Sequence, residues 1–290
     1  RWEFKLLPGE TREEMLDPER IKTLIDPWTP RGTYEIRRAA VYQFHAATAG
    51  KWRAGNVFLA GDAAHQTPPF LGQGMNAGMR DVINFAWKLA LVCQGVAEDK
   101  LLDSYETERT AHATDLVEWA VAIGHLMEHQ AAIELAQRQG KSLPKTPASL
   151  KSSGYGQGRE SPPIRAGVLQ LDQISDKGST GYLFSQPIVT TSGGHTCKLD
   201  ALLGPGFALV YRGDLSLNEH SAEIVSRLNI KRLNIEKLNE QRGHFDNVFR
   251  TSRCALIRPD RIVYGHTTDT VDENMLLADL EKQLALLPLT

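Results

Sequence analysis

This sequence contains few cysteines and no large excess of either charge. Its 290 residues include three cysteines, Cys93, Cys197 and Cys254, which form neither a CxxC pair nor a metal-ligand cluster. Neither a disulfide framework nor a metal site is therefore expected, and a cytoplasmic location is the default. Lysine and arginine number 33 against 35 for aspartate and glutamate, which gives no electrostatic reason to expect nucleic acid or an anionic membrane as a partner. No apolar run is long enough to span a bilayer.

The start of the chain is unusual. Residues 1–7 already alternate polar and apolar side chains, as in the middle of a half-buried strand. We therefore expect this chain to be part of a longer protein. Its 32.2 kDa are enough for two domains with a sizeable core.

The most informative stretch runs from Asn56 to Gly78. Residues 57–60 form a short apolar run typical of a fully buried strand, and Gly61 allows that strand to end in a tight turn. Asp62 then places a carboxylate at the strand end, which is where open α/β sheets bind ligands. Two prolines follow, and three glycines bring bare backbone to the start of a helix. The unpaired N–H groups and positive dipole of a helix N-terminus suit an electron-rich or negatively charged group.

This order of residues resembles the second FAD-binding motif of the class A flavoprotein aromatic hydroxylases, the family of para-hydroxybenzoate hydroxylase and phenol hydroxylase. Residues 68–75 (PPFLGQGM), Arg80-Asp81 and residues 84–89 (NFAWKL) look most like the branch that contains 3-(3-hydroxyphenyl)propionate hydroxylase. The close likeness covers roughly fifty residues, and a weaker one extends to both ends of the chain. Family members begin with a βαβ unit carrying G-x-G-x-x-G for FAD. That fingerprint does not occur in this sequence, which agrees with the expectation of a longer protein.

The resemblance implies a reaction and its cofactors. It implies a monooxygenase with FAD as cofactor, reduced by NADH or NADPH, which hydroxylates a small phenolic compound with molecular oxygen through a flavin C4a-hydroperoxide. The part of the protein in this chain is expected to be inactive alone. Asp62 would accept hydrogen bonds from the ribitol hydroxyls of FAD, because a carboxylate is an acceptor-only group. The other residues expected to contact the cofactor, mainly through their backbone, are Gly61, Pro69, Gly72, Gln73, Gly74, Met75 and Asn76.

The residue that deprotonates the phenol is left open. His45 and His65 are the nearest candidates, although His65 is at least as well explained as a structural histidine. Arg109, in the family-like run YETER, is expected to pair with a carboxylate and so lock two helices together. The side chains of Met75 and Met79 are expected in the core, not at the cofactor.

Two other functions stay open at this point. The chain could belong to a flavoprotein remnant that acts as a binding or assembly module without catalysis. It could also belong to a related FAD monooxygenase whose substrate is not phenolic. FAD bound in stoichiometric amount would distinguish the enzymes from the remnant.

The expected fold class is mixed α/β and α+β, in four parts. Residues 1–45 would carry two strands of a substrate-binding sheet, 1–7 and 34–45, with helical spacing over 11–27 between them. Residues 46–140 would be the C-terminal part of a para-hydroxybenzoate-hydroxylase-like FAD-binding domain with two long helices. The second helix would end near residue 139. The first would bury one apolar stripe, formed by residues 75, 79, 82, 86, 89 and 93. Residues 141–165 read as a linker.

Residues 166–290 are expected to form a thioredoxin-like domain. The pattern predicts a strand at 207–211, a helix at 221–228 and a strand at 230–233. A hairpin of residues 254–258 and 261–265 and a final helix over 272–286 follow. Without CxxC, disulfide exchange is not supported, and the domain would serve packing or subunit contact, as in a homodimer.

Overall fold

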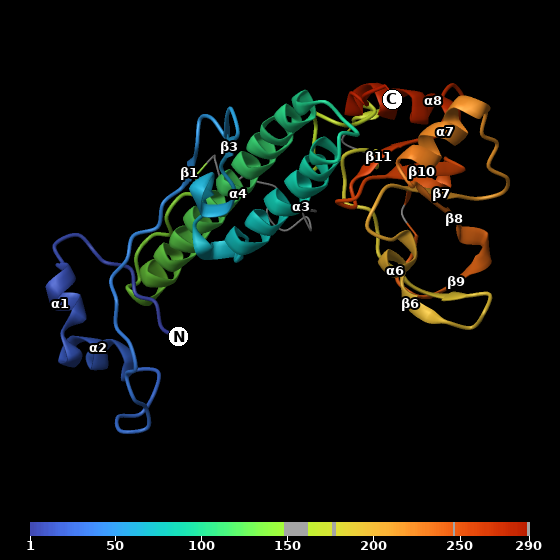
Figure 1. The fold of residues 1–290 in the computed structure, drawn as a ribbon. Helices are drawn as coiled ribbons and strands as arrows, with labels where there is room; N and C mark the ends of the chain where they lie inside the picture. Colours follow the sequence, from blue (N-terminus) through green and yellow to red (C-terminus); the bar gives the residue numbers. More distant parts are fainter. Residues whose placement is uncertain (148–161, 176–177, 246, 289–290) are drawn as a thin grey trace. The chain divides into compact units, whose positions relative to one another are not determined.

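The computed structural model describes residues 1–147, 162–175, 178–245 and 247–288 (Figure 1). The chain divides into two compact units, Arg1–His45 and Ala46–Thr290. No helix in the described ranges is both long and apolar enough to cross a membrane. The predicted linker 141–165 lies partly outside the described residues; its described ends, 141–147 and 162–165, contain neither helix nor strand.

The first unit contains two short helices, α1 (Arg12–Leu16) and α2 (Pro18–Ile25). Thr11 and Glu14 form a reciprocal capping box at the start of α1. Asp17 caps α2 by accepting hydrogen bonds from the N–H groups of Glu19 and Arg20, both at 3.0 Å. The helical prediction for residues 11–27 is therefore confirmed, with Asp17 dividing the region into two helices.

The two strands predicted in this unit are wrong. Residues 1–7 and 34–45 contain no strand. Tyr34 is half-buried, and the other aromatic residues of the two segments are exposed: Trp2, Phe4, Tyr42 and Phe44. The segments do meet: the Tyr42 hydroxyl donates to Glu3 at 2.5 Å, and the Tyr42 and Phe44 rings pack edge to face at 4.9 Å. A strand, however, requires a ladder of backbone hydrogen bonds with a neighbour, and none forms between the described residues of this unit. Their place in a substrate-binding sheet stays a prediction.

The second unit begins with small hairpin elements. The strand β1 (Ala47–Thr48) pairs with β4 (His65–Gln66), and β2 (Arg53–Ala54) pairs with β3 (Val57–Phe58). The prediction of a fully buried strand at residues 57–60 is wrong, because the strand is two residues long and Val57 is 65% exposed. An apolar run shows that a segment can be buried, but β3 has only β2 as a hydrogen-bonded neighbour in the described chain.

Two long helices follow and pack against each other, α3 (Gly74–Cys93) and α4 (Asp103–Arg138). The 3-10 turn η3 (Asp99–Leu102) leads directly into α4. The predicted lengths of both helices are confirmed. Gly95, with φ +68°, and Gly140, with φ +63°, follow the helix ends in the left-handed conformation that glycine tolerates best.

The face of α3 that is buried is opposite to the predicted one. The predicted stripe is largely exposed: Met75 is 76% exposed, and Met79 and Val82 are exposed as well. The expectation that Met75 and Met79 lie in the core is therefore wrong. Buried polar side chains are tolerated where they are paired, and those of α3 find partners on α4. The buried residues of α3 are Ala77, Asp81, Asn84, Trp87 and Lys88.

A four-stranded sheet forms the centre of the C-terminal region, with strand order β11-β10-β7-β8. The strands β7 (Ala208–Tyr211) and β8 (Lys231–Asn234) are parallel and connected through α7 (Glu219–Arg227). The strands β10 (Cys254–Ile257) and β11 (Val263–His266) form the predicted hairpin, and α8 (Glu273–Leu284) follows. The order of elements expected for residues 207–286, and the mixed α/β fold, are confirmed.

A second, three-stranded sheet was not predicted from the sequence. Its strands are β5 (Ile188–Thr191), β6 (Thr196–Lys198) and β9 (Leu238–Arg242), in the order β6-β5-β9. The short helix α6 (Leu199–Leu203) was also missed. These segments are short, and β9 is mostly polar and exposed, so no apolar periodicity marks it. Three 3-10 turns complete the region: η4 (Leu171–Gln173), η5 (Ile235–Lys237) and η6 (Asn247–Arg250).

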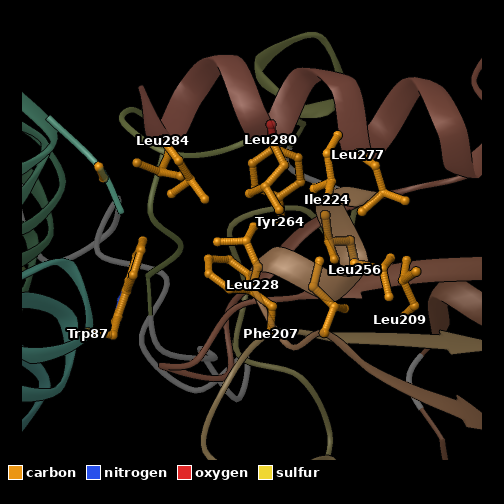
Figure 2. Packing of buried hydrophobic residues seen from close by; sticks show 14 of the residues in the cluster. Trp87, Phe207, Leu209, Ile224, Leu228, Leu256, Tyr264, Leu277, Leu280 and Leu284 are labelled. Atoms are coloured by element: carbon orange, nitrogen blue, oxygen red, sulfur yellow. The ribbon is translucent and has the colours of Figure 1, made fainter. Parts of the chain in front are cut away.

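The main core lies between the four-stranded sheet and the helices α7 and α8 (Figure 2). Leu209, Leu256 and Tyr264 face the helices, while alternate strand residues such as Val210 belong to a second cluster on the opposite face of the sheet. Trp87 of α3 joins the main core, where its ring packs edge to face on Phe207 at 5.3 Å. The C-terminal region and α3 therefore share one hydrophobic core.

Candidate cofactor site

Asp62 lies in a tight turn directly after β3. The 3-10 turn η1 (Gly61–Ala63) begins at Gly61, whose φ of +59° is in the left-handed region that disfavours other residues. The Asp62 side chain is exposed. Among the described residues it makes no hydrogen bond or ion pair, so its oxygens are available to accept hydrogen bonds from a bound molecule.

The turn that carries Asp62 is held in place by α3. The Gly61 N–H donates to the Asp81 carboxylate at 2.9 Å. The backbones also approach closely: a Cβ atom on Gly78 would lie 3.3 Å from the Gly61 Cα. Glycine at residue 78 therefore permits the contact that holds the Asp62 turn against α3.

Asp81 is the centre of a buried three-way contact. Its Oδ2 lies 2.7 Å from Nε2 of His65, and its Oδ1 accepts from Nε of Arg109 at 2.8 Å. All three side chains are almost completely buried. Burial acts to raise the pKa of Asp81, but the hydrogen bond from His65 and the positive charge of Arg109 outweigh it and hold that pKa below its usual value. Asp81 is therefore a buried carboxylate in its charged form.

Two expectations from the sequence are decided by this contact. Arg109 pairs with a carboxylate and links α4 to α3, so its predicted structural role is confirmed. His65 is a buried structural histidine: it bonds Asp81, and its ring stacks on Trp52 at 5.5 Å. His45 is exposed and belongs to the other unit. No candidate for the catalytic base emerges in the described part of this unit.

The first turns of α4 anchor the hairpin that precedes Asp62. The backbone N–H groups of Trp52 and Arg53 each donate to the Glu106 carboxylate at 2.9 Å. Arg53 also forms an ion pair with Asp103 at 2.6 Å, and the Tyr105 hydroxyl donates to the carbonyl of Leu59 at 2.8 Å. The Asp62 turn is thus supported by α4 as well as by α3.

The glycine-rich loop leads into the N-terminus of α3. The 3-10 turn η2 (Pro69–Leu71) ends at Gly72, which has a left-handed φ of +59°. No side chain caps the start of α3, so no capping side chain occupies the N–H groups of its first turn. A Cβ atom on Gly72 or Gly74 would meet nothing within 4 Å, so the space beside this backbone is open. Phe70 pins the loop to α4, because a Cβ on Gly124 would lie 2.6 Å from its ring.

The turn and the helix start lie close together on α3. The turn touches α3 at Gly78, which is four residues from Gly74 and therefore about 6 Å along the helix axis. The turn that carries the Asp62 acceptor thus contacts α3 about one helical turn from the uncapped, positive end of the helix. Both features fit a cofactor that carries hydroxyl groups and an electron-rich ring. The remaining predicted residues follow this path: Pro69, Gly72 and Met75 are exposed, and Gln73, Gly74 and Asn76 are half-buried.

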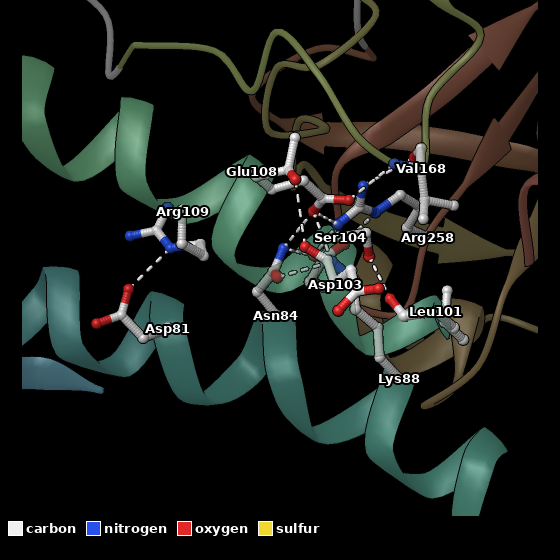
Figure 3. A network of polar contacts seen from close by, with 12 residues as sticks. Asp81, Asn84, Lys88, Leu101, Asp103, Ser104, Glu108, Arg109, Val168 and Arg258 are labelled. Carbon is white, nitrogen blue, oxygen red and sulfur yellow. Dashed lines mark hydrogen bonds and ion pairs between the residues drawn. The ribbon is translucent and has the colours of Figure 1, made fainter. Parts of the chain in front are cut away.

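A second buried polar cluster joins the long helices to the C-terminal sheet (Figure 3). The Glu108 carboxylate of α4 accepts from Arg258 at 2.6 Å, Asn84 at 2.7 Å and Lys88 at 3.0 Å. The Asp260 carboxylate accepts from the same nitrogen of Arg258, Nη2, at 2.6 Å. Burial lowers the pKa of Lys88 to about 8, and the positive charges of Arg258 and Lys88 overcome burial to lower the pKa of Glu108 to about 2.

Sequence reasoning missed the roles of Asp81, Glu108 and Arg258. One signal was present: Asp81, Asn84 and Lys88 recur at helical spacing within an otherwise apolar helix. Polar residues at such spacing on a buried helix require partners, and that requirement could have directed attention to the YETER run. Arg258 carried no comparable signal, because its partner Glu108 is 150 residues away.

Comparison with known proteins gives two matching domain families. Residues 6–120 match the family described as FAD binding domain, and residues 181–283 match the family described as HcaD C-terminal domain. The 3-(3-hydroxy-phenyl)propionate/3-hydroxycinnamic acid hydroxylase of Klebsiella pneumoniae (strain 342) is 37% identical over 216 residues, which are 72% of this chain and 38% of that protein. The protein of the same name from Escherichia coli (strain K12) is 36% identical over the same shares. The chain thus spans well under half the length of these relatives.

Solved structures give the same picture of the fold. The structure of aklavinone-11 hydroxylase with FAD and aklavinone has a TM-score of 0.66 and 26% identity, over 95% of this chain and 52% of that chain. The structure of the flavin-dependent monooxygenase PieE with FAD and substrate has a TM-score of 0.70 over 96% of this chain and 56% of that chain. At 19% identity, the second likeness shows the fold alone.

Proposed function

This chain is a homologue of the FAD-dependent aromatic hydroxylases, and from that premise we propose that the whole protein is an FAD-dependent monooxygenase. Its substrate is a small phenolic compound, of the class that the hydroxyphenylpropionate hydroxylases act on. NADH or NADPH serves as the reductant and molecular oxygen as the second substrate. When bound, FAD supplies the redox and oxygen chemistry, as cofactors do in enzymes of this kind.

One observation of this chain carries the proposal. Asp62 is an exposed carboxylate without a partner among the described residues, and the turn that carries it touches α3 about one helical turn from the open, uncapped N-terminus at Gly74. A carboxylate left unpaired at the end of a rigid turn has no structural task among the described residues. It is well suited to accept hydrogen bonds from hydroxyl groups of a ligand.

Each predicted contact residue has a simple task in this proposal. Asp62 accepts hydrogen bonds from the ribitol hydroxyls, and Gly61 gives the turn its left-handed backbone. The N–H groups from Gln73 to Asn76, at the start of α3, face electron-rich ring atoms and stabilise negative charge there. The N–H of Gly72 donates to the Pro69 carbonyl at 2.9 Å, so the task of Gly72 is to hold the loop in shape. Pro69 restricts the loop in front of them.

The substitution Asp62→Asn in the whole protein tests the proposal. The amide keeps the shape but removes the charge and one acceptor, so we expect the dissociation constant for FAD to rise about tenfold to a hundredfold. Asp172→Asn, at an exposed aspartate of the C-terminal region, is the matched control and should bind FAD like the wild type. Flavin fluorescence quenching measures both.

A substrate screen completes the test. Hydroxylated aromatic acids are added to the holoprotein while NADH or NADPH oxidation and the hydroxylated product are followed. A phenol that accelerates NAD(P)H oxidation and is hydroxylated supports the proposal. A wild-type protein that cannot be reconstituted with FAD refutes it and leaves a non-catalytic module, while turnover only with non-phenolic compounds refutes the substrate class alone.

A further inference from the structure

The Asp81 carboxylate contacts three different elements around the Asp62 turn. It accepts from the Gly61 N–H at the start of η1, bonds His65 of β4, and accepts from Arg109 of α4. Gly61 directly precedes Asp62, so the amide that Asp81 holds is the one that sets the direction of the turn. The Asp81 side chain is completely buried, so it does not contact a ligand itself.

We propose that Asp81 is a positioning residue for the cofactor site, which acts through Gly61 to hold the Asp62 carboxylate in its binding orientation. This inference rests on the proposed function, because it assumes that Asp62 contacts FAD. His65 and Arg109 assist: each occupies one oxygen of Asp81, which leaves the carboxylate a single orientation toward Gly61. Preorganised groups bind a ligand more tightly because less conformational freedom is lost on binding.

The chain provides an internal control for a purely structural role. Glu108 is also a fully buried carboxylate of the same helix pair, with charged partners from α3 and the C-terminal region. No hydrogen bond connects Glu108 to Gly61 or to the Asp62 turn among the described residues. Loss of either carboxylate disturbs the helix packing, but only loss of Asp81 frees the Gly61 amide.

The test compares Asp81→Asn with Glu108→Gln in the whole protein. An asparagine has one acceptor oxygen, so it cannot serve Arg109 on one side and Gly61 with His65 on the other. We expect Asp81→Asn to raise the dissociation constant for FAD about tenfold or more. In the apo protein, the amide exchange of the segment that contains Gly61 should accelerate as well. Glu108→Gln should lower the melting temperature but change both readouts by less than about twofold.

A second pair of variants covers the case in which Asp81→Asn does not fold. His65→Leu removes one partner of Asp81, whereas His65→Gln keeps an N–H donor at the position of Nε2. We expect weaker FAD binding and faster exchange at Gly61 for His65→Leu, and rescue of both by His65→Gln. Equal behaviour of the two variants would overturn the inference.

Other outcomes separate the inference from the proposed function. Wild-type FAD affinity in a folded Asp81→Asn variant, or equal weakening by Glu108→Gln, overturns the positioning role while the function stands. A wild-type protein that binds no FAD overturns both the positioning role and the proposed function. Unchanged amide exchange at Gly61 in Asp81→Asn overturns the inference that Asp81 holds the turn.

Discussion

The buried cluster around Glu108 allows one prediction to be worked out from a count of charges. Lys88 and Arg258 are positive, Glu108 and Asp260 are negative, and the side chains of all four are at most 5% exposed. The cluster is therefore neutral as a whole. Removing one charge leaves an uncompensated buried ion, whereas removing one of each sign keeps the balance.

The expected magnitudes follow from that count. Glu108→Gln leaves two buried cations with one carboxylate, and loss of one partner of a buried pair costs about 3–5 kcal/mol of unfolding free energy. Lys88→Met leaves the opposite imbalance, so we expect a cost in the same range of about 3–5 kcal/mol. In the double variant, the ion pair between Arg258 and Asp260 remains, with Nη2 and Oδ2 2.6 Å apart. We therefore expect the double variant to lose at least about 2 kcal/mol less than the sum of the single losses.

A double-mutant cycle measures this coupling. Urea unfolding of the whole protein, its two single variants and the double variant gives the four unfolding free energies. Leu277→Ala, at a fully buried apolar position of α8, is a control that should combine with Glu108→Gln additively. Additivity of Lys88→Met and Glu108→Gln within about 0.5 kcal/mol would refute the charge-balance reasoning.

Two further predictions concern the same cluster. The folded-state pKa of Glu108, about 2, lies below its ordinary value of 4.5, so its contribution to stability is complete above pH 4.5 and is lost as the pH falls toward 2. Between pH 5 and pH 3 the wild type should accordingly lose more unfolding free energy than Glu108→Gln, and equal losses in urea unfolding would contradict this assignment. Gly167→Ala should cost about 2 kcal/mol or more, because Gly167 has a φ of +89° and a Cβ there would lie 2.3 Å from Cγ of Glu108. Gly194→Ala, at φ +80° with nothing within 4 Å, is the matched control, and equal melting temperatures for the two variants would show that the contact is not tight.

Features that depend on neighbouring residues could be predicted from the sequence alone. The run from Gly61 to Gly78 carries its turns and its helix start in its glycines and prolines, so its form was recognisable without a structure. The ends of α3 and α4 and the order of β7, α7, β8, β10, β11 and α8 were also predicted, since periodicity and turn residues are local properties.

The tertiary structure decided which surfaces are buried and which residues meet. The apolar stripe of α3 that contains Met75 and Met79 is exposed, because the opposite face buries polar side chains whose partners lie on α4 and beyond. Periodicity reveals the spacing of a buried face, but it cannot tell that a polar face will be satisfied by distant ions. The strands expected at residues 1–7 and 34–45 failed for a related reason, since a ladder needs a neighbour that the local sequence does not specify.

The candidate site shows the same division. Asp62 and the glycines of the loop are identifiable from their order in the chain, and the sequence by itself determined that a carboxylate follows a tight turn before a helix start. That Asp81 reaches back 20 residues to the Gly61 amide, and that Arg258 reaches Glu108 across 150 residues, was decided only by the folded structure. Hydrogen bonds and ion pairs act over a few ångströms in space, and separation along the chain carries no information about that distance.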